Sequence, residues 1–138
     1  MNYELMIEQI KQHEGLRLKP YKCSQGYLTI GYGRNLETNG IEPEEAEELL
    51  LNDLSDVEEN LNSIDLLEDH NDARQAVLIN MCFQLGFAGL MRFTRTLRLI
   101  KEFEYEKASV EMLNSRWAKQ TPARAKELAE QMRTGEFL

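Results

Sequence analysis

The sequence is poor in the residues that build disulfides and metal sites, and it has no long hydrophobic run. Its 138 residues include two cysteines, two histidines and three prolines. The histidines, His13 and His70, lie far apart and no His or Cys pair has ligand spacing, so we expect no metal and no cofactor. In a reducing compartment Cys23 and Cys82 are expected to be free thiols. No apolar run approaches the ~20 residues of a membrane span, and the N-terminus lacks a signal pattern, so we expect no membrane insertion and no export signal.

Basic residues are too few to balance the acidic ones, and the excess lies in one part of the chain. The formal net charge is −8, and residues 36–91 alone sum to −13. Residues 14–35 and 92–138 each sum to +3. A molecule with this net charge repels polyanions at long range, so we expect no binding to nucleic acid. The length suits one domain that buries about two-thirds of its unfolded surface.

The most informative stretch begins where the first predicted helix ends, at Glu14. Apolar residues recur at helical spacing before it and predict a helix over residues 3–14, and Gly15 is the residue expected just past a helix end, in the left-handed conformation. The C-terminal end of a helix carries roughly half a negative charge, which disfavours a carboxylate and favours the protonated form. A general acid needs that form, so Glu14 is a candidate catalytic acid. The alternative is a surface acid at a frayed helix end.

Two alternating stretches follow and predict an antiparallel hairpin. Residues 16–23 read as an edge strand and residues 27–32 as its partner, with a three-residue loop between them. Cys23 and Thr29 then lie near the two mouths of the hairpin. The spacing permits Glu14, Cys23 and Thr29 to surround one cleft. The alternatives are a small strand residue without chemistry for Cys23 and a simple β-former for Thr29.

The rest of the chain carries helix signals. Pro43 at a first helical position, with two acids after it, predicts a long helix over residues 43–62. Residues 73–85 are apolar all round and predict a central buried helix that ends at Gly86. Further helices are expected over residues 64–69, 94–101, 105–117 and 122–133, the last of them capped by Thr121.

The stretch from Glu14 to Asn35 resembles the catalytic segment of the phage-type lysozymes, glycoside hydrolase family 24. The family pattern is Glu, eight residues, Asp or Cys, five residues, Thr, which Glu14, Cys23 and Thr29 meet. The blocks 79–100 and 115–127 are also similar to this family, in the same order.

The resemblance implies an α+β, lysozyme-like fold in a single domain over residues 1–138. A small antiparallel β-hairpin lobe would occupy about residues 15–42, and the long helix over 43–62 would join it to a larger helical lobe. That lobe would comprise residues 63–138 together with the helix over 3–14. Because the segment before the long helix is short, the N-terminal lobe is expected to be nearly a bare hairpin and turn.

The resemblance also implies an endolysin that hydrolyses the β-1,4 bond between N-acetylmuramic acid and N-acetylglucosamine in peptidoglycan, for host cell lysis. Glu14 would protonate the leaving oxygen, and a water held by Cys23 and Thr29 would attack from the opposite face with inversion. Phe83 and Thr96 match positions that contact the saccharide. The expected form is a monomer made in the host cytoplasm, which reaches periplasmic peptidoglycan after a holin permeabilises the membrane.

Two other functions remain open. A lytic transglycosylase of similar fold would use Glu14 alone and release an anhydro sugar. A catalytically dead module would only bind peptidoglycan. Arg116 is either a solvated charge or a contact across the cleft.

Three further expectations concern individual side chains. Gly31 and Gly33 predict close backbone packing rather than a phosphate loop, because no helix and no Lys-Ser/Thr pair follows them. Arg34 is expected to pair with Asp53 on the long helix. Lys19 or Lys22 could lower the pKa of the Cys23 thiol if either points toward it.

Overall fold

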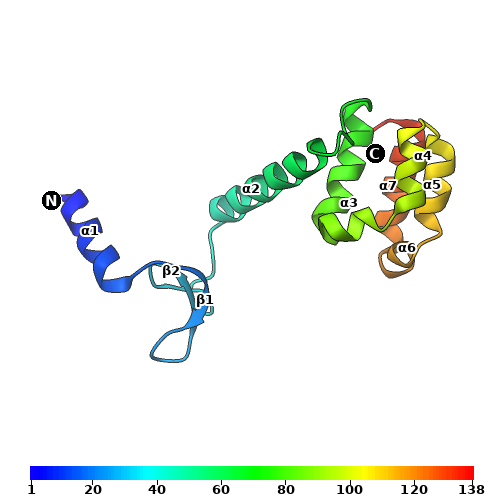
Figure 1. The fold of residues 1–138 in the computed structure, drawn as a ribbon. Helices are drawn as coiled ribbons and strands as arrows, with labels where there is room; N and C mark the ends of the chain where they lie inside the picture. Colours follow the sequence, from blue (N-terminus) through cyan, green and yellow to red (C-terminus); the bar gives the residue numbers. More distant parts are fainter. The chain divides into compact units, whose positions relative to one another are not determined.

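Seven helices and a small sheet make up the computed structural model, in the order α1, β1, β2, β3 and then α2 to α7 (Figure 1). This confirms the predicted α+β class. The chain divides into two compact units, residues 1–49 and 50–138, and the division falls within the long helix α2. The expectation of one lysozyme-like domain that includes both units stays a prediction.

Helix α1 spans Tyr3–Glu14 as predicted, and the side chain of Asn2 caps its start by accepting a hydrogen bond from the Leu5 N–H at 3.2 Å. Gly15 follows with φ 72° and ψ 153°. The predicted left-handed helical conformation is therefore wrong, although φ is positive as expected. The chain must pass directly from the helix into a strand, and the extended ψ achieves this. Almost only glycine adopts this backbone region.

The sheet comprises β1 (Arg17–Lys22), β2 (Leu28–Gly31) and β3 (Arg34–Asn35), all antiparallel, with β2 in the centre. The edge position of β1 is confirmed. The Cys23 N–H donates to the Tyr27 carbonyl at 2.9 Å and closes the predicted three-residue loop. The predicted antiparallel hairpin is confirmed, and a third short strand, β3, extends it beyond the nearly bare hairpin and turn that we expected. Positive φ values at Gly31 and Gly33 let the chain reverse within a tight turn and form β3.

Helix α2 spans Pro43–Asn62, which are the predicted limits. Its first turn is tied to β3, because Arg34 donates two hydrogen bonds to the Glu45 carboxylate at 2.8 and 3.1 Å. The predicted pairing of Arg34 with Asp53 is therefore wrong. Asp53 lies eight residues further along the helix than Glu45, a rise of about 12 Å. The hydrogen bonds from Arg34 stabilise the ionised form of the Glu45 carboxyl, so the pKa of this carboxyl is lowered.

The core lies in the second unit and centres on α3 (Asp72–Met91). The prediction of a buried apolar helix here is confirmed. Gly86, with φ 79° and ψ 162°, interrupts α3 at the position where the helix was predicted to end. Around α3 are α4 (Thr94–Lys101), α5 (Tyr105–Leu113), α6 (Arg116–Gln120) and α7 (Pro122–Thr134). Its fully buried side chains include Val77, Leu78, Met81 and Cys82.

Three local predictions in this unit were wrong. Residues 64–69 form turns rather than a helix, and Asp65 has a positive φ of 54° that helical backbone does not allow. The helix expected over 105–117 is two helices, because Ser115 accepts a hydrogen bond from the Ala118 N–H and caps a new one. Thr121 precedes α7 but does not cap it, since its hydroxyl donates to the Trp117 carbonyl at 3.0 Å.

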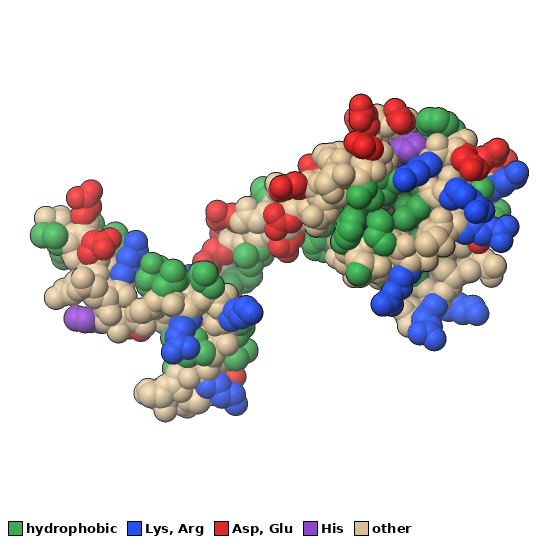
Figure 2. Space-filling model, in the orientation of Figure 1, with side chains coloured by type: hydrophobic (Ala, Val, Ile, Leu, Met, Phe, Trp, Pro, Cys, Tyr) green, Lys and Arg blue, Asp and Glu red, His purple; other side chains and the backbone are tan.

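Charge is distributed unevenly over these elements. Figure 2 shows acidic side chains along α2, which has eight Asp and Glu residues among its 20 and no Lys or Arg.

No single helix is long and apolar enough to cross a membrane. Helices α3 and α4 taken together have the length and the apolar composition of a membrane span, but the pair is bent by 105°.

Candidate active site

The Glu14 carboxyl lies against the turn between β2 and β3. In the sheet, Arg17 pairs with Gly31, so the chain just before β1 runs beside the turn just after β2. Glu14 is three residues before Arg17, and its side chain packs against Gly33 in that turn. The residue is exposed. The end of α1 therefore presents an accessible carboxyl group at one end of the central strand.

Cys23 lies at the other end of β2, at the start of the β1–β2 loop. Its side chain is half-buried and forms no disulfide, as predicted for both cysteines. The backbone of Gln25 lowers the pKa of the thiol most, that of Tyr27 next, and the Thr29 hydroxyl also lowers it, while desolvation opposes them. Hydrogen-bond donors that face a sulfur atom stabilise its anion. The loop thus favours the thiolate, the form that can act as a base.

Lysine has no part in this effect. Neither Lys19 nor Lys22 is among the groups that shift the pKa of Cys23, so the suggestion that they lower it was wrong. Both side chains are exposed on β1, which allows water to screen them. Cys82 shows the opposite behaviour, because burial in α3 raises the pKa of its thiol.

Thr29 is the only buried residue of the first unit, with 3% of its surface exposed. Its hydroxyl donates to the Tyr27 carbonyl at 2.9 Å. A hydroxyl has one proton, so it can give that proton either to this carbonyl or to the Cys23 sulfur. Thr29 and Cys23 therefore lie near each other at the β1–β2 end of the sheet, where the hydroxyl can turn toward the sulfur.

The two glycines of the β2–β3 turn differ in what surrounds them. Close packing is confirmed for Gly33, where an added Cβ would collide with Glu14. It is wrong for Gly31, where an added Cβ would meet nothing within 4 Å. Gly31 is explained by its φ of +70°, which the tight turn requires.

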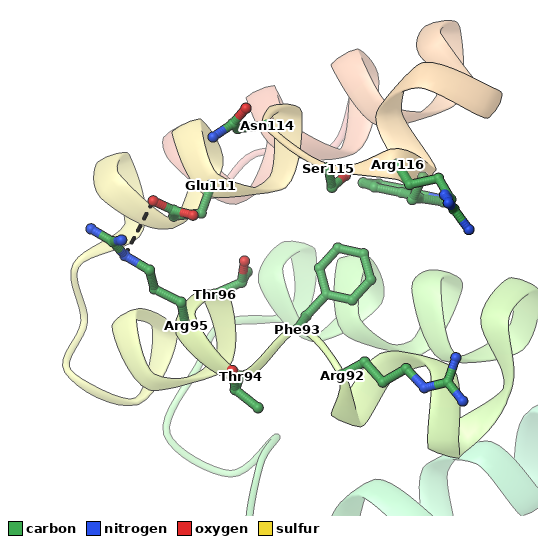
Figure 3. Close-up of a pocket in the computed structure, with 10 residues that line it drawn as sticks. Arg92, Phe93, Thr94, Arg95, Thr96, Glu111, Asn114, Ser115 and Arg116 are labelled. Atoms are coloured by element: carbon green, nitrogen blue, oxygen red, sulfur yellow. Dashed lines mark ion pairs between the residues drawn. The ribbon is translucent and has the colours of Figure 1, made fainter.

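The predicted saccharide-binding residues belong to the second unit. Thr96 lines a pocket of about 290 Å³ between α4, α5 and the start of α6. Figure 3 shows Phe93 within it and Arg95 reaching Glu111, with 3.2 Å between Nε and Oε1. Phe83 does not line this pocket, and 42% of its surface is exposed.

Arginine side chains give the pocket a basic rim. Arg92 and Arg116 line it and form no ion pair, whereas Arg95 is paired. Behind the rim, the buried Trp117 indole donates to the Gln84 amide oxygen at 2.8 Å. The pocket thus offers free cationic groups, and Thr96 lies in its wall with 4% of its surface exposed. No group of three or more His, Cys, Asp or Glu side chains is placed to hold a metal ion.

Comparison with known proteins identifies the family. The model of the family described as phage lysozyme matches residues 11–134. The chain belongs to the phage lysozyme family. The match includes Glu14, Cys23 and Thr29, and it extends through the second unit as far as residue 134. As a member of this family the protein is a glycoside hydrolase, a muramidase, and its substrate is peptidoglycan.

Individual relatives span most of the chain. Probable T4-type lysozyme 1 of Dictyostelium discoideum is 30% identical over 158 aligned residues, which cover 93% of each protein. An endolysin of Acyrthosiphon pisum secondary endosymbiont phage 1 is 34% identical over 80% of this chain and 75% of its own length. The pre-baseplate central spike protein Gp5 of Enterobacteria phage T4 is 31% identical over 94% of this chain, which corresponds to 28% of Gp5.

Proposed function

We propose that this enzyme hydrolyses the β-1,4 bond between N-acetylmuramic acid and N-acetylglucosamine by an inverting mechanism, with Glu14 as the general acid. One observation carries the proposal. An exposed carboxyl group at the end of α1 and a neighbouring thiol and hydroxyl lie against the same three-stranded sheet, at opposite ends of its central strand. This is the pair of groups, one acidic and one basic, that inverting hydrolysis requires.

In the proposed reaction, Glu14 gives its proton to the glycosidic oxygen as the bond to the anomeric carbon breaks. A water held by Cys23 and Thr29 attacks that carbon from the opposite face, and the Cys23 thiolate accepts the water proton. Glu14 ends as a carboxylate and Cys23 as a thiol, and exchange with solvent restores both. The lowered pKa of Cys23 supports this role, because it increases the fraction of thiolate at neutral pH.

The positions of the acid and the base are the basis for proposing inversion rather than retention. Inverting enzymes separate their two catalytic groups by ~6.5–9.5 Å to leave room for a water, whereas retaining enzymes need ~5–5.5 Å. Glu14 packs against Gly33 just past one end of β2, and Cys23 lies beside the other end, where Lys22 pairs with Leu28. This placement supports a wide separation with a water as nucleophile.

We also propose that Thr96 and Phe83 contact the saccharide chain. Thr96 can offer a hydroxyl at a pocket whose rim holds two unpaired arginines, and Phe83 offers an exposed aromatic face for a sugar ring. Thr96→Val keeps the shape and removes the hydroxyl, so it should raise KM with little change in kcat.

The biological role that fits is host cell lysis. We propose a monomeric endolysin that is made in the host cytoplasm and reaches the periplasmic peptidoglycan once a holin has permeabilised the inner membrane. A relative named endolysin covers most of this chain and supports the role. Lysis of chloroform-permeabilised Gram-negative cells but not of intact ones would test the need for permeabilisation.

The product of the reaction tests the mechanism. Proton NMR of a digest of soluble peptidoglycan fragments should show the α-anomer first, because inversion of a β bond gives an α product. An initial β-anomer would overturn inversion, an anhydro sugar would indicate a lytic transglycosylase, and binding without any product would indicate a dead module. The Glu14→Gln variant serves as the control for a contaminating hydrolase.

A further inference from the structure

We propose that Gly33 is a positioning residue for the reaction, because its missing side chain provides the space in which the Glu14 carboxyl lies. The inference deepens the proposed function and rests on Glu14 as the general acid. Gly33 itself touches no reacting atom. It fixes the place from which Glu14 delivers its proton.

The distances define a close fit. A Cβ added to Gly33 would lie 2.5 Å from Oε2 of Glu14, 3.0 Å from Cδ and 3.5 Å from Cγ. Non-bonded carbon atoms attract best at about 3.5–4.0 Å, and the first two distances are well inside that limit. Any side chain at position 33 therefore excludes the carboxyl from its present position.

The contact between Glu14 and Gly33 follows from the path of the chain in the first unit. Gly15 turns the chain from α1 into β1, and the pairing of Arg17 with Gly31 then brings the end of α1 beside the β2–β3 turn. Gly33 lies two residues past Gly31 in that turn. The same two glycine-dependent turns thus bring the acid and its space together.

A substitution at Gly33 should affect catalysis more than stability. The group that collides is the far end of an exposed, flexible side chain, which can rotate aside into water with little cost to the fold. A displaced acid, however, donates its proton from the wrong place. Misplacement of a reacting group by about 1 Å can cost on the order of 10²-fold in rate.

Gly31 provides a matched control in the same turn. Its φ is +70° and that of Gly33 is +77°, so alanine pays a similar backbone strain at either position. The Cβ of Gly31→Ala would meet nothing within 4 Å, whereas that of Gly33→Ala would meet Glu14. The difference between the two variants therefore isolates the collision with the acid.

The kinetic test compares both alanine variants on soluble peptidoglycan fragments. Both should lose a similar amount in melting temperature. Gly33→Ala should have a kcat about 10- to 100-fold below that of Gly31→Ala, with a similar KM, since substrate binding is not the property that changes. Equal kcat values in the two variants would overturn the inference.

A second measurement does not depend on activity or on a folded variant. In the wild-type protein, NMR should show a nuclear Overhauser effect between the α-protons of Gly33 and the γ-protons of Glu14, and none from Gly31. Its absence would overturn the inference even if the kinetics agreed. If instead Glu14→Gln stayed active while this contact was present, the proposed function would fail and the packing of Glu14 on Gly33 would stand.

Discussion

A carboxylate at the end of α1 faces the negative end of the helix dipole, and Glu14 has no ion-pair partner that would offset this. We therefore predict that Glu14→Gln abolishes lysis but leaves the melting temperature unchanged or slightly raised, because the amide removes the unfavourable charge. Turbidity of permeabilised cells and thermal unfolding measure the two effects. A large loss of stability would instead indicate a structural role.

Cys23 is the residue where the chemistry departs most from a pair of carboxylates. If its thiolate accepts the water proton, Cys23→Ser should lose most activity and Cys23→Asp should preserve it, because Asp restores a full-time base. Alkylation by a small reagent should abolish activity. Cys82→Ala is the required background, since Cys82 is buried and its reaction with the reagent would unfold the protein.

The pH dependence of the rate in the same variants tests whether Cys23 acts as the base. A base must be deprotonated to act, so the wild-type rate should rise with pH through the pKa of Cys23. The donors of the β1–β2 loop lower that pKa, so the rise should lie below the ordinary thiol range. Cys23→Asp should move it several units further down. Near-normal turnover in Cys23→Ala with an unchanged profile would show that the thiol takes no part.

Among the secondary-structure elements, the junction of α1 and β1 is the most sensitive to backbone conformation. Gly15 has φ 72° and ψ 153°, and an added Cβ would meet nothing within 4 Å. Gly15→Ala should therefore destabilise the fold by about 1 kcal/mol or more through backbone strain alone. Chemical denaturation measures the free energy of unfolding. A wild-type value would mean that the junction adopts another conformation in solution.

Element limits could be predicted where a local chemical signal sets them. Pro43 and the acids after it placed the start of α2, and Gly86 placed the break in α3. The break between α5 and α6 was missed, because Ser115 becomes a cap only when the chain leaves the helix before it. Ser115, a residue type preferred at helix starts, was the signal in the sequence that could have indicated the start of α6.

The members of the candidate site could be proposed from the sequence, but their contacts could not. Glu14, Cys23 and Thr29 were singled out by helix-end and hairpin patterns together with the family resemblance, and their catalytic roles stay a prediction. The fit of Glu14 to Gly33 depends on strand register, which the irregularity between Arg17 and Tyr21 shifts. No local pattern contains that information.

For the whole molecule, the net charge of −8 opposes an anionic substrate, and α2 holds eight of the acidic groups without one basic residue. We predict that replacing exposed Glu58 and Glu59 by Gln, which removes two negative charges and takes the net charge to −6, raises kcat/KM on peptidoglycan about two- to fivefold at low salt. The gain should vanish near ~1 M salt, where the Debye length falls to about 3 Å.

The matched control changes charge in the opposite direction. Lys107→Gln with Lys126→Gln removes two exposed positive charges that form no ion pair and takes the net charge to −10. This variant should lose kcat/KM at low salt and recover at high salt. The loss of two negative charges also relieves repulsion within α2 and can stabilise the variant with Glu58→Gln and Glu59→Gln, so its melting temperature must be measured. A gain in kcat/KM that came from greater stability would persist at high salt, whereas a gain that came from weaker repulsion would be screened. A gain that persisted at high salt would therefore refute the electrostatic explanation.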